Sequence, residues 1–209
     1  MMNIGNVFRM AVLLSLAAPL GSAGVVYSVA IDTSSESGVS GGIYFQFNGG
    51  LNPDLASIQI DTFLIGAPGG LTATPAPVAD GGVTGSLDSL PLTIDNSGGN
   101  NDYLHYLTFG SDIFFTVDFL LPPVLTGDSG STFSFGLTAS DGITPVLTLD
   151  ASGFIGQISY DTNGVFTTTT LGNDSIETIT SAVPEPGTGF LLACALSAVS
   201  IRLRRRGRS

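Results

Sequence analysis

The most constraining feature of this sequence is the alternation of apolar and polar residues in short runs. The clearest run is Ser57–Ile65, in which one face would carry Ile58, Ile60, Thr62 and Leu64. Thr132–Ala139 repeats the pattern, with Phe133, Phe135 and Leu137 on one face. A period of two is typical of a strand with one buried face, and no helical period persists over about ten residues between positions 24 and 180. The sequence therefore predicts an all-β domain in this region.

Turn residues separate further runs of the same kind, which indicates a series of short strands. The predicted strands are Val25–Ile31, Ile43–Asn48, Ser57–Ile65, Leu90–Asp95, Tyr103–Phe109, Ile113–Leu120, Thr132–Ala139, Val146–Leu149, Phe154–Tyr160, Val165–Thr170 and Ile176–Thr180. Asn163-Gly164 predicts a type I′ hairpin turn, whose two central residues both have positive φ. Leu71–Gly85, rich in Gly and Pro, is expected to be a long surface loop. We predict a jelly-roll-like β-sandwich over residues 24–180.

Charged residues are distributed very unevenly along the 209 residues. The chain has no lysine, and its arginines are confined to Arg9 and to positions beyond 201. Every acidic residue except Glu185 lies between positions 24 and 184, where His105 is the only side chain able to become positive. A body of this kind repels the phosphates of nucleic acid, which excludes nucleic acid as a partner.

The N-terminus has the layout of a secretory signal peptide over residues 1–23. Arg9 precedes the apolar run Met10–Leu20, and small residues follow up to Ala23. Cleavage is expected between Ala23 and Gly24. The apolar run is too short for a membrane span of roughly 20 residues, although an uncleaved anchor or a core helix is an alternative.

The C-terminus, residues 181–209, combines three different segments. Val183-Pro184-Glu185-Pro186 is expected to be extended, because each proline disfavours helix in the residue before it. The apolar segment Gly187–Ile201 follows, and we expect it to form a single transmembrane helix. The chain then ends in an arginine cluster comprising Arg202, Arg204, Arg205, Arg206 and Arg208. These arginines would keep the tail in the cytoplasm, so the body would lie outside the inner membrane.

This three-part C-terminus resembles the PEP-CTERM sorting signal. The resemblance implies recognition by an exosortase, a membrane-embedded cysteine enzyme of Gram-negative, often biofilm-forming bacteria. That enzyme would cut near Pro184-Glu185-Pro186 and release the body or transfer it to another anchor. Extracellular polysaccharide is an implied partner, since family members are common in bacteria that make it. The alternative is a plain single-pass anchor behind a Pro-rich spacer.

Nucleophilic catalysis has little support in the sequence. His105 is the only histidine, no serine lies in a Gly-x-Ser-x-Gly elbow, and His105 is expected to be a half-exposed strand residue. Cys194, the only cysteine, lies in the apolar C-terminal segment and predicts neither a disulfide nor a zinc site. A secreted glycoside hydrolase using two of the many carboxylates is kept as an alternative.

Calcium is the best candidate for a metal. The segment 95–102 collects oxygen-bearing side chains around a Gly pair, namely Asp95, Asn96, Asn100, Asn101 and Asp102. It lacks the EF-hand spacing, and a turn rich in Asn and Asp between two strands is the competing explanation.

Carbohydrate binding would suit an exported β-sandwich. Tyr103 and Tyr106 offer aromatic faces, although alternation puts them on opposite faces of one strand and the chain has no tryptophan. Asn173-Asp174-Ser175 is a formal glycosylation sequon, expected to be idle in a bacterium.

Together these features predict a non-enzymatic protein of the cell surface or extracellular matrix, processed by an exosortase, with a structural or adhesive role. It would sit in the inner membrane transiently and then at the cell surface or outside the cell. A polysaccharide-binding module is the first alternative, and a secreted hydrolase is the second.

Overall fold

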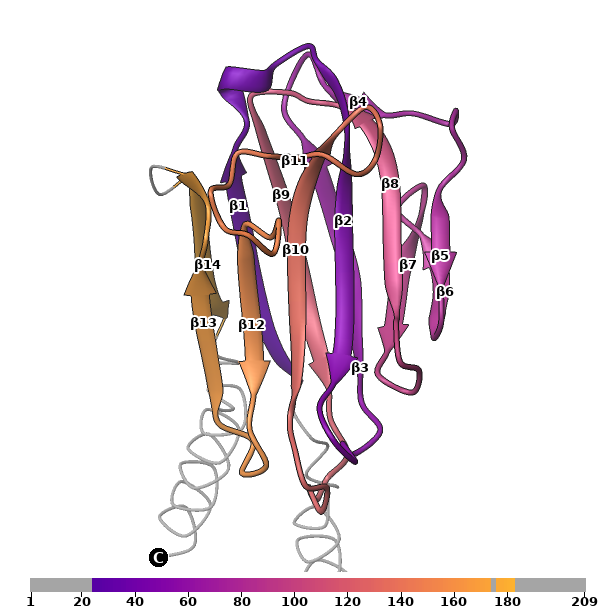
Figure 1. Cartoon of the computed structure of the whole chain (residues 1–209), viewed down its shortest axis with the longest axis vertical. Helices are drawn as coiled ribbons and strands as arrows, with labels where there is room; N and C mark the ends of the chain where they lie inside the picture. The colour runs from indigo at the N-terminus through magenta and orange to yellow at the C-terminus, as the bar shows by residue number, and fades with distance from the viewer. Residues whose placement is uncertain (1–23, 174–175, 183–209) are drawn as a thin grey trace, which may run out of the picture.

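The computed structural model describes residues 24–173 and 176–182, and these residues form two antiparallel sheets (Figure 1). The strands are β1 (Val25–Asp32), β2 (Ser40–Gly49), β3 (Ser57–Ile65), β4 (Gly70–Leu71), β5 (Val78–Asp80), β6 (Val83–Ser86), β7 (Ser89–Asp95), β8 (Asp102–Thr108), β9 (Asp112–Leu120), β10 (Ser131–Ala139), β11 (Pro145–Val146), β12 (Gly156–Tyr160), β13 (Phe166–Thr170) and β14 (Glu177–Ala182). A 3₁₀ turn, η1 (Ser34–Glu36), follows β1. The predicted all-β class is therefore confirmed.

The two sheets have different strand orders. The six-stranded sheet runs β14-β1-β9-β3-β7-β6, and the eight-stranded sheet runs β13-β12-β10-β2-β8-β4, with β11 beside β10 and β5 beside β8. In Figure 1 the eight-stranded sheet lies toward the viewer, with the other sheet behind it. This arrangement is consistent with the predicted β-sandwich.

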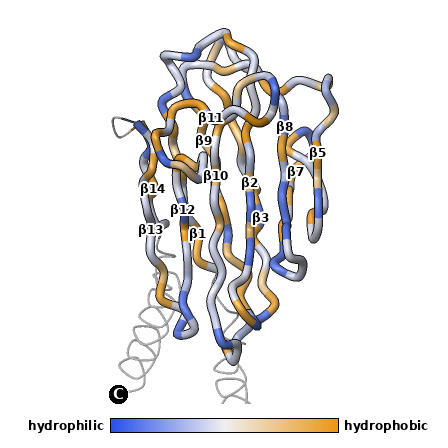
Figure 2. Tube along the Cα trace, viewed as in Figure 1, coloured by the Kyte–Doolittle hydropathy of each residue, from blue (hydrophilic) through white to orange (hydrophobic). Residues whose placement is uncertain are grey.

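Aromatic rings from both sheets fill the space between them. Phe45 of β2 meets Phe115 of β9 at a centroid distance of 5.2 Å, and Phe47 meets Phe119 at 6.0 Å, both edge to face. All four side chains are at most 1% exposed. Figure 2 shows the matching alternation of hydropathy along the strands. The core is thus a continuous apolar layer to which both sheets contribute.

Every predicted strand segment overlaps an observed strand, although Val146–Leu149 shares only Val146 with β11, and two local predictions were wrong. In β3 the register shifts between Ile60 and Thr62, so Leu64 is 60% exposed instead of sharing the buried face of Ile58. A bulge of this kind rotates all later side chains by half a period. In the β12–β13 hairpin only Gly164 has positive φ, at 73°, so the turn is not type I′. Asp161 closes it instead by accepting backbone bonds at its side chain from Asn163 and Val165.

The predicted loop Leu71–Gly85 is also partly wrong. It contains β5 and most of β6, which add to one edge of the eight-stranded and six-stranded sheets, respectively. Strands of two to four residues are too short to display a period, which explains why β4, β5 and β6 escaped the sequence pattern.

Several predictions fall outside the described residues. These are the signal peptide with Ala23, the sequon residues Asp174 and Ser175, and the sorting signal with its arginines from residue 183 onward. Gly24, on the other side of the predicted cleavage site, is the first described residue. No helix within residues 24–173 or 176–182 is long and apolar enough to cross a membrane.

Candidate functional site

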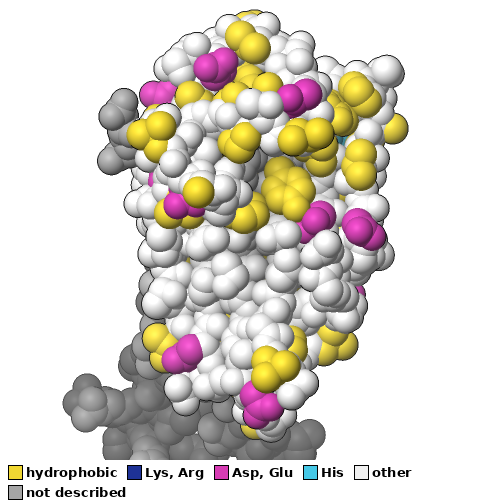
Figure 3. Space-filling model, in the orientation of Figure 1, with side chains coloured by type: hydrophobic (Ala, Val, Ile, Leu, Met, Phe, Trp, Pro, Cys, Tyr) yellow, Lys and Arg dark blue, Asp and Glu magenta, His cyan; other side chains and the backbone are white. Residues whose placement is uncertain are grey.

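The outer face of the eight-stranded sheet carries a groove built around two aromatic rings. Tyr44 of β2 and Phe154, which precedes β12, lie nearly parallel, with ring centroids 5.9 Å apart and planes 24° apart. Both side chains are half-buried. The groove they border has a volume of about 150 Å³. In Figure 3 hydrophobic side chains gather over the upper part of this face, with acidic side chains among them.

Glycines let two loops close over the sheet to form the groove. A Cβ on Gly136 would lie 2.7 Å from the Gly153 carbonyl oxygen, so only glycine there lets the loop before β12 approach. Gly142, with φ at +71°, forms the tip of the loop between β10 and β11, and its missing Cβ would lie 2.7 Å from the Tyr106 hydroxyl. Tyr106 therefore stands at the edge of the groove, on the outer face of β8.

One polar atom in the groove lining has no partner. Thr138 of β10 is 9% exposed and lines the groove beside Pro145 and Gly136. Its hydroxyl oxygen Oγ1 is buried without a hydrogen bond to any described residue. A buried hydroxyl without a partner is costly, but this oxygen has no exposed surface, so a ligand in the groove could bond it only after the side chain turns.

Two exposed carboxylates anchor the loops of the groove. Asp141 accepts hydrogen bonds from the backbone N–H of Ile143 and of Thr144, at 2.9 and 2.8 Å. Asp150 accepts one from the backbone N–H of Ser152 at 2.8 Å. Hydrogen bonds from the side chain and backbone of Thr144 and from the backbone of Ile143 lower the pKa of Asp141. Hydrogen bonds from Ser152 lower the pKa of Asp150. Both carboxylates are therefore charged at neutral pH.

A row of polar side chains continues the face one step further along the strands. The row crosses from β13 to β8 and consists of Thr169, Gln157, Ser134, Gln46 and Asp102. Gln157 Nε2 donates to Ser134 Oγ at 3.2 Å, and Gln46 Nε2 donates to Asp102 Oδ1 at 2.8 Å. Gln46 also donates to the Tyr44 hydroxyl at 3.3 Å, which ties the row to the groove. Burial and the adjacent Asp102 carboxylate raise the pKa of Tyr44, so its hydroxyl stays protonated.

The opposite face of β8 holds His105, and here the expectation of a half-exposed histidine was wrong. His105 is 0% exposed and Tyr103 is 1% exposed. The two residues do share one strand face, as alternation predicted, but that face is turned into the core. Because Tyr103 is buried, it offers no ring surface to a sugar, which corrects its predicted stacking role.

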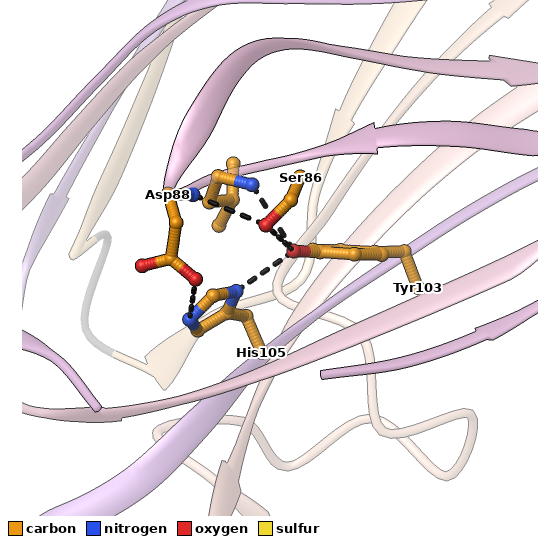
Figure 4. Close-up of polar contacts among 5 residues, drawn as sticks. Ser86, Asp88, Tyr103 and His105 are labelled. Atoms are coloured by element: carbon orange, nitrogen blue, oxygen red, sulfur yellow. Dashed lines mark hydrogen bonds and ion pairs between the residues drawn. The ribbon is translucent and has the colours of Figure 1, made fainter. Parts of the chain in front are cut away.

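Hydrogen bonds from a hairpin of the other sheet explain why these polar groups are buried (Figure 4). The Tyr103 hydroxyl lies 2.7 Å from His105 Nδ1 and 3.2 Å from Ser86 Oγ, and it accepts the Leu87 backbone N–H at 3.1 Å. The Asp88 carboxylate lies 3.5 Å from His105 Nε2. Ser86, Leu87 and Asp88 belong to the β6–β7 hairpin, so this cluster links the two sheets.

The protonation states in this cluster follow from burial. Burial lowers the pKa of His105, while the Asp88 charge and the Thr72 carbonyl oppose the shift. Burial raises the pKa of Tyr103, and its hydrogen bonds with Ser86 and Leu87 oppose this shift. We assign the neutral Nε2–H tautomer to His105, with Tyr103 donating to Nδ1 and Nε2–H facing Asp88. The imidazole is enclosed, so a substrate has no approach to it, and we interpret the cluster as structural.

The calcium candidate segment is organised by hydrogen bonds to the protein. Asn96 is 4% exposed; its Oδ1 accepts the Ala56 N–H at 2.9 Å, and its Nδ2 donates to Ser131 Oγ at 2.8 Å. Asn101 is fully buried, and its Oδ1 accepts from Gly82 and Gly98.

The carboxylates at the two ends of this segment also have partners. Asp95 accepts bonds from Ser97, and Asp102 accepts one from Gln46. Among the residues that the structure describes, no three His, Cys, Asp or Glu side chains gather closely enough to hold a metal ion. Calcium binding at this segment stays a prediction.

Sequence reasoning missed the two central residues of the groove. Tyr44 carried a usable signal, because it alternates with the core residues Phe45 and Ile43 and so had to face outward. Phe154 carried none, since it lies in a loop and reaches Tyr44 only through the pairing of β10 with β2 and β12. The chain matches no protein-family model, no curated protein and no solved structure.

Proposed function

We propose that the chain is an exported, non-enzymatic protein of the cell surface or extracellular matrix, sorted by an exosortase. Its body would be a jelly-roll-like β-sandwich between a signal peptide and a single transmembrane helix. The observation that carries the proposal is the placement of charge: every arginine lies in one of the two terminal segments, and the body between them has none. Loss of both ends would leave a polyanion that stays soluble and away from anionic surfaces.

The body also fits a binding or adhesive role better than a catalytic one. Its only histidine is enclosed in the core, whereas its groove lies open on a sheet face. A polysaccharide-binding module is the second candidate function. Aromatic rings beside amide and hydroxyl side chains, as on the outer face of the eight-stranded sheet, favour it.

Intact-mass measurement of the exported protein tests the sorting proposal. In exosortase-competent cells we expect loss of residues 1–23 and of the arginine-rich tail. Changing Pro184 and Pro186 together to Ala should leave the tail in place, while the matched pair Pro122→Ala and Pro123→Ala should be processed normally. Retention of residues 187–209 in the unaltered protein would replace the sorting proposal with a plain membrane anchor.

A further inference from the structure

The groove between Tyr44 and Phe154 has the chemistry of a sugar site rather than of a protein-docking patch. The nearly parallel rings give an apolar surface that suits the C–H face of a pyranose ring. Thr138, nine-tenths buried in the lining, adds a hydroxyl without a hydrogen-bond partner, which would have to turn toward the groove to bond a sugar hydroxyl. A small volume of about 150 Å³ fits one ring of a longer chain.

Charge identifies which sugar would be accepted. Asp141 precedes the groove residue Gly142, and Asp150 lies two residues before Ser152, so an exposed carboxylate stands on each loop. Asp102 adds a third acidic group, joined through Gln46 to the Tyr44 hydroxyl. No Lys or Arg lies anywhere between positions 24 and 182 to bind a uronic acid, sulfate or phosphate group. Charge complementarity therefore favours a ligand that carries amino groups.

We propose that this groove binds an amino sugar unit of an extracellular polysaccharide. The ring would stack against Tyr44 and Phe154, and the ammonium group would face the carboxylates of Asp141 and Asp150. A sugar hydroxyl would bond Thr138 Oγ1 once that side chain turns toward the groove. This inference rests on the proposed function only for its setting, because the polysaccharide would be met outside the cell.

Calorimetric titration of the full-length chain in detergent with short glucosamine oligomers tests the site independently of sorting and cleavage. We expect binding, weakened about tenfold by Phe154→Ala through loss of the stacking surface. Ile143→Arg should abolish binding, because it places a positive charge on an exposed side chain of the groove lining. Ile143 is 81% exposed, so this variant keeps the test valid if Phe154→Ala fails to fold.

Matched controls lie on the opposite sheet. Leu64→Ala removes an exposed apolar side chain and Asp61→Asn removes an exposed charge, and both should leave binding unchanged. Two further probes distinguish the ligand class. Fully N-acetylated oligomers, which lack the charge, should bind more weakly, and spermine, which lacks the ring, should be insensitive to Phe154→Ala.

Three outcomes would overturn the proposal. Equal binding of the acetylated oligomer would reassign the groove to neutral sugars. Binding that survives both Phe154→Ala and Ile143→Arg would be diffuse attraction to a polyanion. No binding of any oligomer would refute the proposed sugar site, while the intact-mass result for sorting would be unaffected.

Discussion

Two pairs of ring-bearing side chains lie on opposite faces of the eight-stranded sheet. Tyr103 and His105 on β8 point into the core, and Tyr44 on β2 points out to Phe154. The strands are paired so that Phe45 faces Tyr103 and Tyr44 faces Leu104. A single step along the strand thus separates an enclosed polar cluster from an open groove.

The comparison shows that enclosure, not residue type, distinguishes these regions. The Tyr103 hydroxyl has Leu87, Ser86 and His105 within hydrogen-bonding distance, and the His105 ring is fully buried, so a ligand cannot reach the cluster. Each region also holds one buried atom without a hydrogen bond to the described residues, His105 Nε2 in the cluster and Thr138 Oγ1 in the groove lining. The cluster of Tyr103, His105 and Asp88 therefore links the two sheets.

The largest expected effect is on stability, from removing the buried ring. Tyr103→Ala should lower the free energy of unfolding by about 3–5 kcal/mol, as truncation of a buried aromatic side chain does. Tyr44→Ala should cost clearly less, because its ring is half-exposed. Chemical denaturation of both variants measures the difference. Equal losses would mean that the two faces are packed alike.

Removing only the hydroxyl sharpens the same contrast. Tyr103→Phe should cost about 1–3 kcal/mol, because the Leu87 N–H and His105 Nδ1 would be left buried without a partner. Tyr44→Phe should cost less, about 0.5 kcal/mol, since its hydroxyl bonds Gln46 in a part-buried position and leaves no fully buried partner behind. Chemical denaturation curves of Tyr103→Phe and Tyr44→Phe measure the two changes in unfolding free energy. A neutral Tyr103→Phe would contradict the proposed sheet-linking role.

The buried cluster should also make stability depend on pH. Burial lowers the pKa of His105 below its ordinary 6.5, so the stability associated with neutral His105 is complete above that pH. It is lost as the pH falls through the lowered folded-state pKa. We expect the denaturation midpoint to decrease as the pH is lowered from about 7.5 to about 5. Histidine is the side chain that ordinarily titrates in this range. His105→Gln should flatten the profile, and a flat profile in the unaltered protein would refute the assignment.

The smallest expected effect concerns calcium. Asn96 and Asn101 already bond backbone N–H groups, so adding calcium should leave the thermal midpoint unchanged within error. Magnesium serves as the control for ionic effects. A midpoint that rises with calcium alone would show that the ion binds the folded state, in support of the predicted site at segment 95–102.

Much of the fold was predictable because a half-buried strand imposes its period on the sequence. The β10 face of Phe133, Phe135 and Leu137 was read correctly, and all three are fully buried. The bulge in β3 was not predictable, since one inserted residue shifts the phase without altering composition. Very short strands such as β4 left no period to detect.

The candidate site was less predictable, for a different reason. Alternation correctly assigned Tyr103 and Tyr106 to opposite faces of one strand. It did not say which face was inside, because that depended on partners from the β6–β7 hairpin. The groove needs Tyr44, Thr138 and Phe154 to meet across three segments, which only strand pairing brings about.

A body with no arginine or lysine has a further physical consequence. Its folded form is held by apolar packing and hydrogen bonds, and like charges on its surface repel one another. Dissolved ions screen that repulsion over about 8 Å at physiological ionic strength, and there are no Lys or Arg ion pairs for them to weaken. Rising salinity should therefore stabilise the body.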